Sequence, residues 1–227
     1  METALRDHIT FFREFRDRFE TTGAIAPSSR FLARAMTSPM QARSQPARIL
    51  EIGPGTGAVT RRIVKLLGPD DRFDLVELNE TFARVLKDRF ERQPDYARVA
   101  NQSEIHVCGI EEFEPLTRYD YIISGLPLNN FPAELVASIF ETYFRLLAPG
   151  GALSYFEYMY VRSIKKRAAG RSERERLSQI DTIIDPYFAR SRFKTDWVFA
   201  NVPPAWVQHL RSDQETTLDD ASCERVS

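Results

Sequence analysis

A glycine-rich segment carries the clearest chemical pattern in the chain. It reads L-E-I-G-P-G-T-G (50–57), and it follows an apolar run and precedes a stretch with helical periodicity. Glycines permit a tight turn and a close approach of a ligand to the backbone, and the first N–H groups of a helix are free to bind a ligand. Glu77 stands twenty residues after Gly57, at the end of the next apolar run. A carboxylate at that place can accept hydrogen bonds from both ribose hydroxyls, so the pattern predicts a nucleoside site.

The surrounding pattern predicts an α/β fold that presents this segment at one edge of a sheet. Strand-like apolar runs alternate with helical stripes, which is typical of a doubly wound, mostly parallel, Rossmann-like sheet with helices on both faces. We expect strands at 47–52, 72–77, 104–108, 119–124 and 151–158, and helices at 57–67, 80–92, 132–147 and 173–189. Residues Arg192–Asn201 and Trp206–Arg211 then favour a C-terminal antiparallel hairpin.

Two helices are expected ahead of the sheet as an N-terminal cap. Apolar residues recur at three- and four-residue steps in the first one, at Leu5, Ile9, Phe12, Phe15 and Phe19. The serines after Pro27 suit the cap of a second helix, Arg30–Met36. We therefore divide the chain into an arm (1–46), a core domain (47–211) and an acidic tail (212–227) that we expect to be disordered.

Two classes of cofactor compete for the glycine segment. Counted through Ala58, the stretch from Gly53 approaches G-x-G-x-x-A, the fingerprint of nicotinamide and flavin sites, and a tight turn without any ligand is a third interpretation. No substrate domain and no second mononucleotide-binding half follow in the sequence, which disfavours a dinucleotide. The form E-x-G-x-G-x-G resembles motif I of the class I S-adenosylmethionine-dependent methyltransferases. We therefore favour S-adenosylmethionine as the cofactor, with S-adenosylhomocysteine as its product.

This resemblance implies a set of cofactor-binding residues at the carboxyl ends of the strands. In that family Glu77 would hold the ribose, and residues 109–111 after the third strand would flank the adenine. The acid at position 111 equally suits the first turn of a helix. The expected set is Glu51, Gly53, Gly55, Thr56, Gly57, Glu77, Leu78, Gly109, Ile110, Glu111 and Ser124.

The segment S-G-L-P-L-N-N-F-P (124–132) follows the fourth strand and should face the donor methyl group. In amino methyltransferases the corresponding segment is N/D-P-P-Y or N-L-P-Y, whose carbonyl groups accept hydrogen bonds from the amine. Here Gly125 replaces the Asn or Asp and Leu128 replaces the aromatic residue, so that only Ser124 offers a side-chain acceptor. Because a planar base needs a stacking aromatic, this departure disfavours a nucleobase amine as the acceptor.

Four segments together are similar to the bacterial phospholipid N-methyltransferases: residues 23–30, 50–57, 124–132 and 201–205. The resemblance runs from about Phe11 to Val207 and implies stepwise methylation of phosphatidylethanolamine toward phosphatidylcholine by a cytoplasmic, peripherally membrane-associated enzyme. We expect Tyr155 and the carbonyls of Ser124, Gly125 and Leu126 to position the acceptor amine. The expected lipid-binding residues are Ser28, Ser29, Arg30, Asn129, Tyr158 and Tyr160. Helix capping by the serines and half-buried strand positions for the tyrosines are the alternatives.

Composition and charge add further limits. The chain has 227 residues, of which 43% are hydrophobic, and a net charge of -1, and it has no apolar run near the roughly 18 residues of a membrane span. Two cysteines predict neither a zinc cluster nor a disulfide framework, and no metal site is expected. Residues Arg162–Arg176 carry a local net charge of +5, which suits either a solvated face or an anionic membrane surface. The phenylalanine-striped first helix suits the same membrane surface or a lid over the site.

Three other functions stay open. An RNA adenine N6-dimethyltransferase resembles the first half of the chain, but it would carry an Asn-Leu-Pro-Tyr loop and a basic C-terminal helical domain, and this chain has neither. A small-molecule amine N-methyltransferase and a donor-binding module without activity are the others. We expect a monomer that acts on a phospholipid at an anionic membrane surface and binds no nucleic acid.

Overall fold

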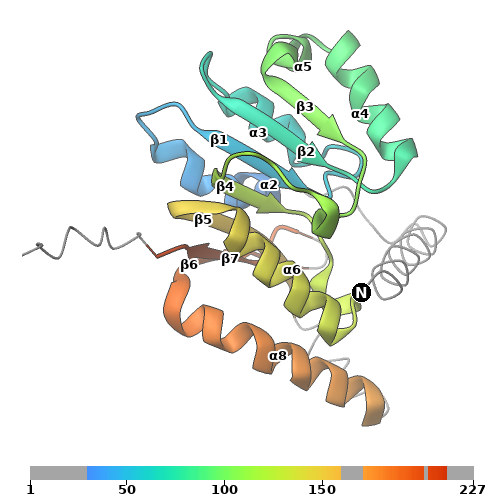
Figure 1. The fold of residues 1–227 in the computed structure, drawn as a ribbon, viewed down its shortest axis with the longest axis vertical. Coiled ribbons are helices and arrows are strands. Elements are labelled where there is room, and N and C mark those ends of the chain that lie inside the picture. The colour runs from blue at the N-terminus through green and yellow to red at the C-terminus, as the bar shows by residue number, and fades with distance from the viewer. Residues whose placement is uncertain (1–29, 160–170, 202–203, 214–227) are drawn as a thin grey trace, which may run out of the picture.

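The computed structural model describes residues 30–159, 171–201 and 204–213, and these form a seven-stranded sheet covered by helices (Figure 1). The strands are β1 Arg48–Ile52, β2 Arg72–Val76, β3 Ser103–His106, β4 Tyr119–Ser124, β5 Leu147–Tyr158, β6 Arg192–Val198 and β7 Ala205–Arg211. The α-helices are α2 Arg30–Met36, α3 Thr60–Leu66, α4 Glu80–Arg92, α5 Pro94–Ala97, α6 Ala133–Leu146 and α8 Arg171–Ser191. Short 3-10 turns lie at Ser38–Ala42 (η1), Ala100–Gln102 (η2), Ile110–Glu112 (η3) and Leu128–Asn130 (η4).

The strand order β3-β2-β1-β4-β5-β7-β6 places five parallel strands beside an antiparallel hairpin. Ile52 at the end of β1 pairs with Val76 on one side and with Ser124 on the other. Ser124 in turn pairs with Tyr155 of β5. The ends of these strands therefore meet along one side of the sheet, which we call the carboxyl edge. The expected Rossmann-like α/β class is confirmed.

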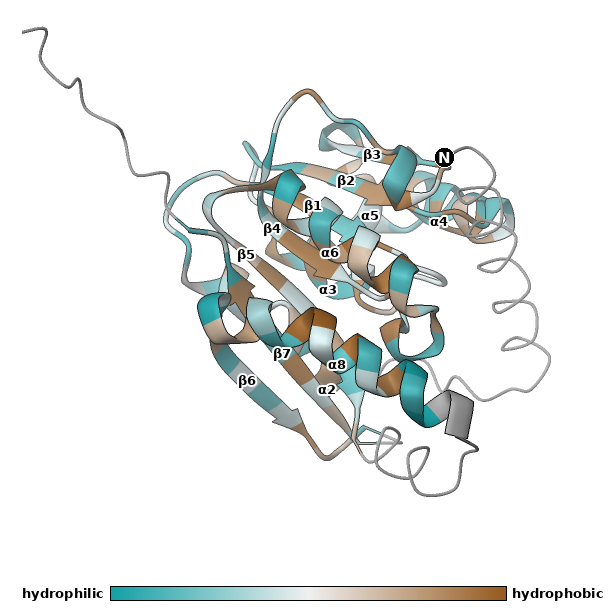
Figure 2. Cartoon of the chain, turned by 60° about the horizontal axis from the view of Figure 1, so that its bottom comes forward, coloured by the Kyte–Doolittle hydropathy of each residue, from teal (hydrophilic) through white to brown (hydrophobic). Residues whose placement is uncertain are grey.

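The two faces of the sheet are packed by different helices. Alternate residues of β1 point to opposite faces, so that Leu50 packs with α6 and α8 while Ile49 packs with α2, α3 and α4. Figure 2 shows the most hydrophobic strands in the middle of the sheet and a largely hydrophilic β6 at its border. The apolar strands are covered on both sides, as a parallel sheet requires.

Several element boundaries differ from the predictions. The helix expected to begin at Gly57 begins at Thr60, because Gly57 has a φ of 77° and its N–H closes a turn onto Pro54. The fifth strand begins at Leu147 and pairs with β4 across a register irregularity. The helix expected at Arg30–Met36 and the C-terminal hairpin are confirmed. The first predicted helix and most of the acidic tail lie outside the described residues.

The helices within the described ranges are all too short or too polar to cross a bilayer.

A buried polar network joins the hairpin to the N-terminal arm. His209 is fully buried, and its Nδ1 lies 2.8 Å from the Ser154 hydroxyl while its Nε2 lies 3.1 Å from Asp196 Oδ2. The same Asp196 oxygen accepts hydrogen bonds from Lys194 and from Ser38 in η1. Burial lowers the pKa of His209 below its usual 6.5, although Asp196 opposes this shift. Burial therefore outweighs Asp196 and favours a neutral histidine.

We predict that this histidine makes the fold sensitive to mild acid. The unfolded chain binds a proton at His209 below about pH 6.5, while the folded chain resists it, so that stability falls as the pH falls by up to about 1.4 kcal/mol per unit. A His209→Gln variant should be less stable at pH 7.5 but should lose less stability between pH 7 and 5.5. Urea unfolding at several pH values measures this slope, and parallel decreases in the two proteins would contradict the prediction.

Candidate cofactor and acceptor site

The glycine segment forms a tight loop at the end of β1. Gly53, Gly55 and Gly57 have φ values of 65°, 57° and 77°, a left-handed conformation that residues with a side chain rarely adopt. The Gly53 N–H donates to the Val76 carbonyl at 2.9 Å, so the loop is fastened to β2 as it leaves β1. The sequence therefore needs glycines here for the backbone path itself, and the loop leaves its polar backbone at the carboxyl edge.

Glu77 fixes the other side of this loop. The carboxylate is fully buried, and it accepts hydrogen bonds from the Gly55 N–H at 2.9 Å and from the Asn79 N–H at 2.8 Å. Asn79 also caps α4 through its side chain, while Leu78 between them is half-buried. Glu77 therefore fixes the loop from the end of β2, at the place where the sequence predicts a carboxylate for the ribose.

Glu51 is a second buried acid under the loop. Burial raises its pKa from 4.5 to about 8, the nearby Glu77 carboxylate adds to this shift, and hydrogen bonding from Thr60 opposes it. Its Oε2 atom is buried and has no hydrogen-bond partner among the described residues. An unsatisfied buried carboxyl oxygen costs free energy unless a ligand supplies a partner. The raised pKa of Glu51 therefore favours the neutral carboxylic acid at pH 7.

The glycine loop after β1 (the donor loop, residues 53–57) touches the loop after β4 (the acceptor loop, residues 124–132) where the two strands end. The Gly125 N–H donates to the Ile52 carbonyl at 2.8 Å. A Cβ atom added to Gly125 would lie 2.7 Å from the Gly53 carbonyl oxygen, and one added to Gly53 would lie 2.8 Å from Leu126 Cδ2. Gly125 must be glycine because its neighbour is backbone, whereas Gly53 meets the movable end of a side chain and needs glycine for its φ of 65°. The carbonyl oxygen of Gly125 accepts no hydrogen bond from the described part of the chain, so it is available to a ligand.

Tyr143 of α6 supports the acceptor loop through a contact with Ser124. Its hydroxyl lies 2.5 Å from the Ser124 hydroxyl, which also accepts a 3.3 Å hydrogen bond from the Leu126 N–H. Tyr143 is fully buried, which raises its pKa, and the hydroxyl therefore stays protonated. The only side-chain acceptor expected in this loop is thus already engaged within the protein. No sequence motif marks Tyr143, which belongs to the apolar stripe of its helix.

Arg176 of α8 holds the far part of the same loop. Its guanidinium donates to the backbone carbonyls of Asn129, at 2.9 Å, and Phe131. Asn129 itself is buried, and Phe131 is fully buried in the core. In the sequence Arg176 is the last residue of the cationic segment 162–176, so charge counting gives it no specific role. In the structure its charged group stabilises the turn η4 by binding these backbone carbonyls.

The structure brings some of the other predicted site residues together and separates others. Gly109, Ile110 and Glu111 form the start of η3, and Glu111 lies close enough to Tyr143 to influence its pKa. Tyr155 is fully buried on the α6 side, with its ring 5.6 Å from Phe140, whereas Tyr158 packs with the cluster on the opposite face. Thr56 is exposed, and Arg30 is exposed with its guanidinium over the Phe31 ring. Ser28, Ser29 and Tyr160 lie outside the described residues.

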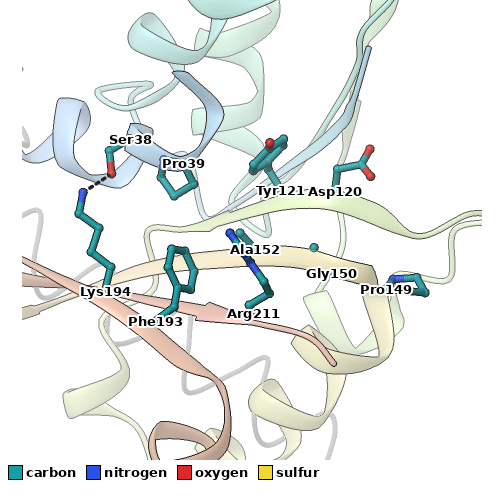
Figure 3. A pocket seen from close by; sticks show the side chains of 11 residues that line it. Ser38, Pro39, Asp120, Tyr121, Pro149, Gly150, Ala152, Phe193, Lys194 and Arg211 are labelled. Carbon is teal, nitrogen blue, oxygen red and sulfur yellow. Dashed lines mark hydrogen bonds between the residues drawn. The ribbon is translucent and has the colours of Figure 1, made fainter. Parts of the chain in front are cut away.

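A separate cavity of about 350 Å³ lies at the opposite edge of the sheet (Figure 3). Tyr121 near the start of β4 and Arg211 at the end of β7 line it. At its mouth the Lys194 ammonium donates a hydrogen bond to the Ser38 hydroxyl. None of the predicted cofactor or acceptor residues contributes to this cavity. It therefore does not belong to the site described above.

The described geometry fits the methyl donor that the sequence predicts. A glycine loop with left-handed backbone, a buried carboxylate at the end of β2 and a buried carboxyl oxygen that lacks a partner in the described part of the chain lie next to each other. These groups suit a ligand that carries a ribose and positive charge. Next to them the Gly125 carbonyl can accept a hydrogen bond from an amine.

Comparisons with known proteins agree with this interpretation. A family model described as "Methyltransferase domain" matches residues 50–153. The ornithine lipid N-methyltransferase of Singulisphaera acidiphila is 30% identical over 156 residues, which are 68% of this chain and 80% of that protein. Among solved structures, an O-methyltransferase from Bacillus cereus in complex with SAH has a TM-score of 0.62 at 16% identity, covering 88% of this chain and 90% of its own. A putative caffeoyl-CoA O-methyltransferase from Staphylococcus aureus has a TM-score of 0.60 at 18% identity, covering 90% and 92%.

We predict that Gly125→Ala separates the two loops and weakens donor binding. The added methyl group would overlap the Gly53 carbonyl, and overpacking of this kind costs about 1–3 kcal/mol, or roughly 5- to 150-fold in affinity. Calorimetric titration with S-adenosylmethionine measures the change. Gly68→Ala is the matched control, because its Cβ would meet only Asp71 at an ordinary 3.7 Å. Equal affinities of the two variants would contradict the prediction.

We also predict that donor binding releases a proton from Glu51. A cationic ligand favours the charged carboxylate, so a group with a pKa of about 8 should lose about one proton on binding at pH 7. The binding enthalpy of the wild-type protein should then depend on the ionisation enthalpy of the buffer. Glu51→Gln should bind with a buffer-independent enthalpy. A wild-type enthalpy that is the same in all buffers would refute this assignment.

Proposed function

Because the chain belongs to the class I S-adenosylmethionine-dependent methyltransferases, we propose that it methylates the amine of a membrane lipid, with phosphatidylethanolamine and its mono- and dimethyl forms as acceptors. The observation that carries the proposal is the similarity to an ornithine lipid N-methyltransferase over four fifths of that protein. The acceptor loop supports an aliphatic amine, because Leu128 stands where a stacking aromatic would be needed for a base.

The proposed chemistry is an in-line displacement at a sulfonium methyl group. S-adenosylmethionine supplies the methyl group and leaves as S-adenosylhomocysteine when the nitrogen lone pair forms the new N–C bond. The acceptor ammonium must first lose a proton, and an apolar site lowers its pKa. Buried Leu126 and Leu128 provide such a site at the carboxyl edge. Since no strong base is required, positioning and exclusion of water account for the rate.

The Gly125 carbonyl is the proposed acceptor for the amine N–H. Ser124 acts through the loop, because its hydroxyl is bonded to Tyr143 and to the Leu126 N–H. Tyr143 and Arg176 are positioning residues that keep the loop in one conformation. Tyr155 pairs with Ser124 across β4 and β5 and packs beneath the acceptor loop in the hydrophobic cluster that contains α6.

The remaining proposed contacts are with the lipid and its membrane. Ser28, Ser29 and Arg30 bind the lipid phosphate, and Asn129, Tyr158 and Tyr160 lie near the headgroup. The first helix and the cationic residues of 162–176, apart from Arg176, bind an anionic membrane surface from the cytoplasm. The enzyme is proposed to act there as a monomer.

The decisive experiment offers isotope-labelled S-adenosylmethionine together with four acceptors: phosphatidylethanolamine vesicles, ornithine lipid vesicles, unmodified ribosomal RNA and soluble ethanolamine. We expect label in the phosphatidylethanolamine phase after extraction, and chromatography of the products then counts the methyl groups. Glu77→Ala should abolish transfer to every acceptor, because it removes the carboxylate that holds Gly55.

Each other outcome has a distinct meaning. Label in ornithine lipid alone would support a lipid amine as the acceptor but would show that the headgroup is ornithine and not ethanolamine. Label in RNA or in soluble ethanolamine alone would contradict the proposal. Donor binding without transfer to any amine would indicate a binding module.

A further inference from the structure

Large aromatic side chains are exposed at the outer end of the hairpin. Trp197 is 60% exposed and Phe199 is 64% exposed. Their ring centroids lie 5.8 Å apart, and Trp206 of β7 stacks edge-on against Trp197, also at 5.8 Å. We call these three residues the aromatic rim. A contiguous apolar patch is uncommon on the water-exposed surface of a protein and usually marks an interaction site.

The register of the sheet places the aromatic rim at the carboxyl edge, on the same side as the acceptor loop. Trp197 pairs with Trp206, and Trp206 pairs with Glu157 of β5. Glu157 follows Tyr155 by two residues, and Tyr155 pairs with Ser124 at the end of β4. Phe199 lies beyond the end of β6, just after the buried Val198. The aromatic rim and the acceptor loop therefore lie at the same edge of the sheet. A membrane bound by the rim would lie next to the place where the acceptor amine must enter.

The groove beside the aromatic rim is lined by Arg192 and Lys194 and by the buried acid Glu157. Helix α2 packs against β6 and β7, and its Arg30 and Arg34 are exposed and form no ion pair with any described residue. Arg192 lines the groove of about 590 Å³ beside Trp197 and Trp206 and is likewise without an ion pair in the described ranges. The acid on β6, Asp196, is already bonded to Lys194 and His209. Exposed tryptophan and phenylalanine, with Arg192 in the adjoining groove, suit the interface of a bilayer with anionic headgroups.

We propose that the aromatic rim is a membrane anchor that inserts Trp197 and Phe199 into the headgroup region of the bilayer. The identity of the partner rests on the proposed function, since the acceptor amine is presented by a lipid. Insertion at this point directs the carboxyl edge, with the acceptor loop, toward the membrane. The anchor is formed by the folded hairpin and is distinct from the first helix and the segment 162–176.

The chain contains its own reporter for this anchor. It has two tryptophans, and both belong to the aromatic rim. With vesicles of phosphatidylethanolamine and phosphatidylglycerol, the intrinsic fluorescence of the full chain should shift to the blue, and lipids brominated near the headgroup end of the acyl chain should quench it. Vesicle binding without a shift or quenching would overturn the proposal, and so would the absence of vesicle binding.

A pair of variants separates the anchor from catalysis. Trp197→Ala combined with Phe199→Ala should lower vesicle binding at least tenfold in co-sedimentation, while methylation of a short-chain, water-soluble ethanolamine lipid stays unchanged. Leu116→Ala is the matched control, since Leu116 is fully exposed but lies outside the aromatic rim. Unchanged vesicle binding by the double variant would refute the anchor even if lipid is methylated. Rim-dependent binding by a protein that methylates no lipid would support the anchor and refute the proposed function.

Discussion

The contact between Gly53 and Gly125 is the constraint on which the site depends. The loop after β1 and the loop after β4 approach so closely that a methyl group on Gly125 would overlap the backbone carbonyl of Gly53. The hydrogen bond from the Gly125 N–H to the Ile52 carbonyl sets this spacing. A ligand held by the first loop is therefore next to a ligand held by the second. Transfer of a methyl group needs this proximity more than it needs any acid or base.

Side chains from outside the two loops keep the loops in place. Glu77 binds the donor loop through Gly55, while Tyr143 and Arg176 bind the acceptor loop from α6 and α8. The two sides of the sheet thus have different roles. The helices α6 and α8 support the acceptor loop, and α3 covers Glu51 on the donor side.

Local patterns in the sequence predict the donor side well. The alternation of strands and helices predicts the sheet, and the glycine spacing predicts the loop, because both depend on residues close together in the chain. Glu77 is found in the same way, from its place at the end of the second strand. The role of Tyr143, nineteen residues from Ser124, and that of Arg176, over forty residues from Asn129, arise only from tertiary packing. The alternation of side chains along a strand places Tyr155 and Tyr158 on opposite faces of the sheet, although both lie at the end of the same strand.

The central claim is that the acceptor loop holds a lipid amine beside the donor site. A crystal structure with S-adenosylhomocysteine and a short-chain ethanolamine lipid tests it most directly. We expect the amine nitrogen to lie within about 3 Å of the Gly125 carbonyl oxygen, with the ribose against Glu77. An amine bound elsewhere, with the Gly125 carbonyl bonded to water or to the protein, would contradict it.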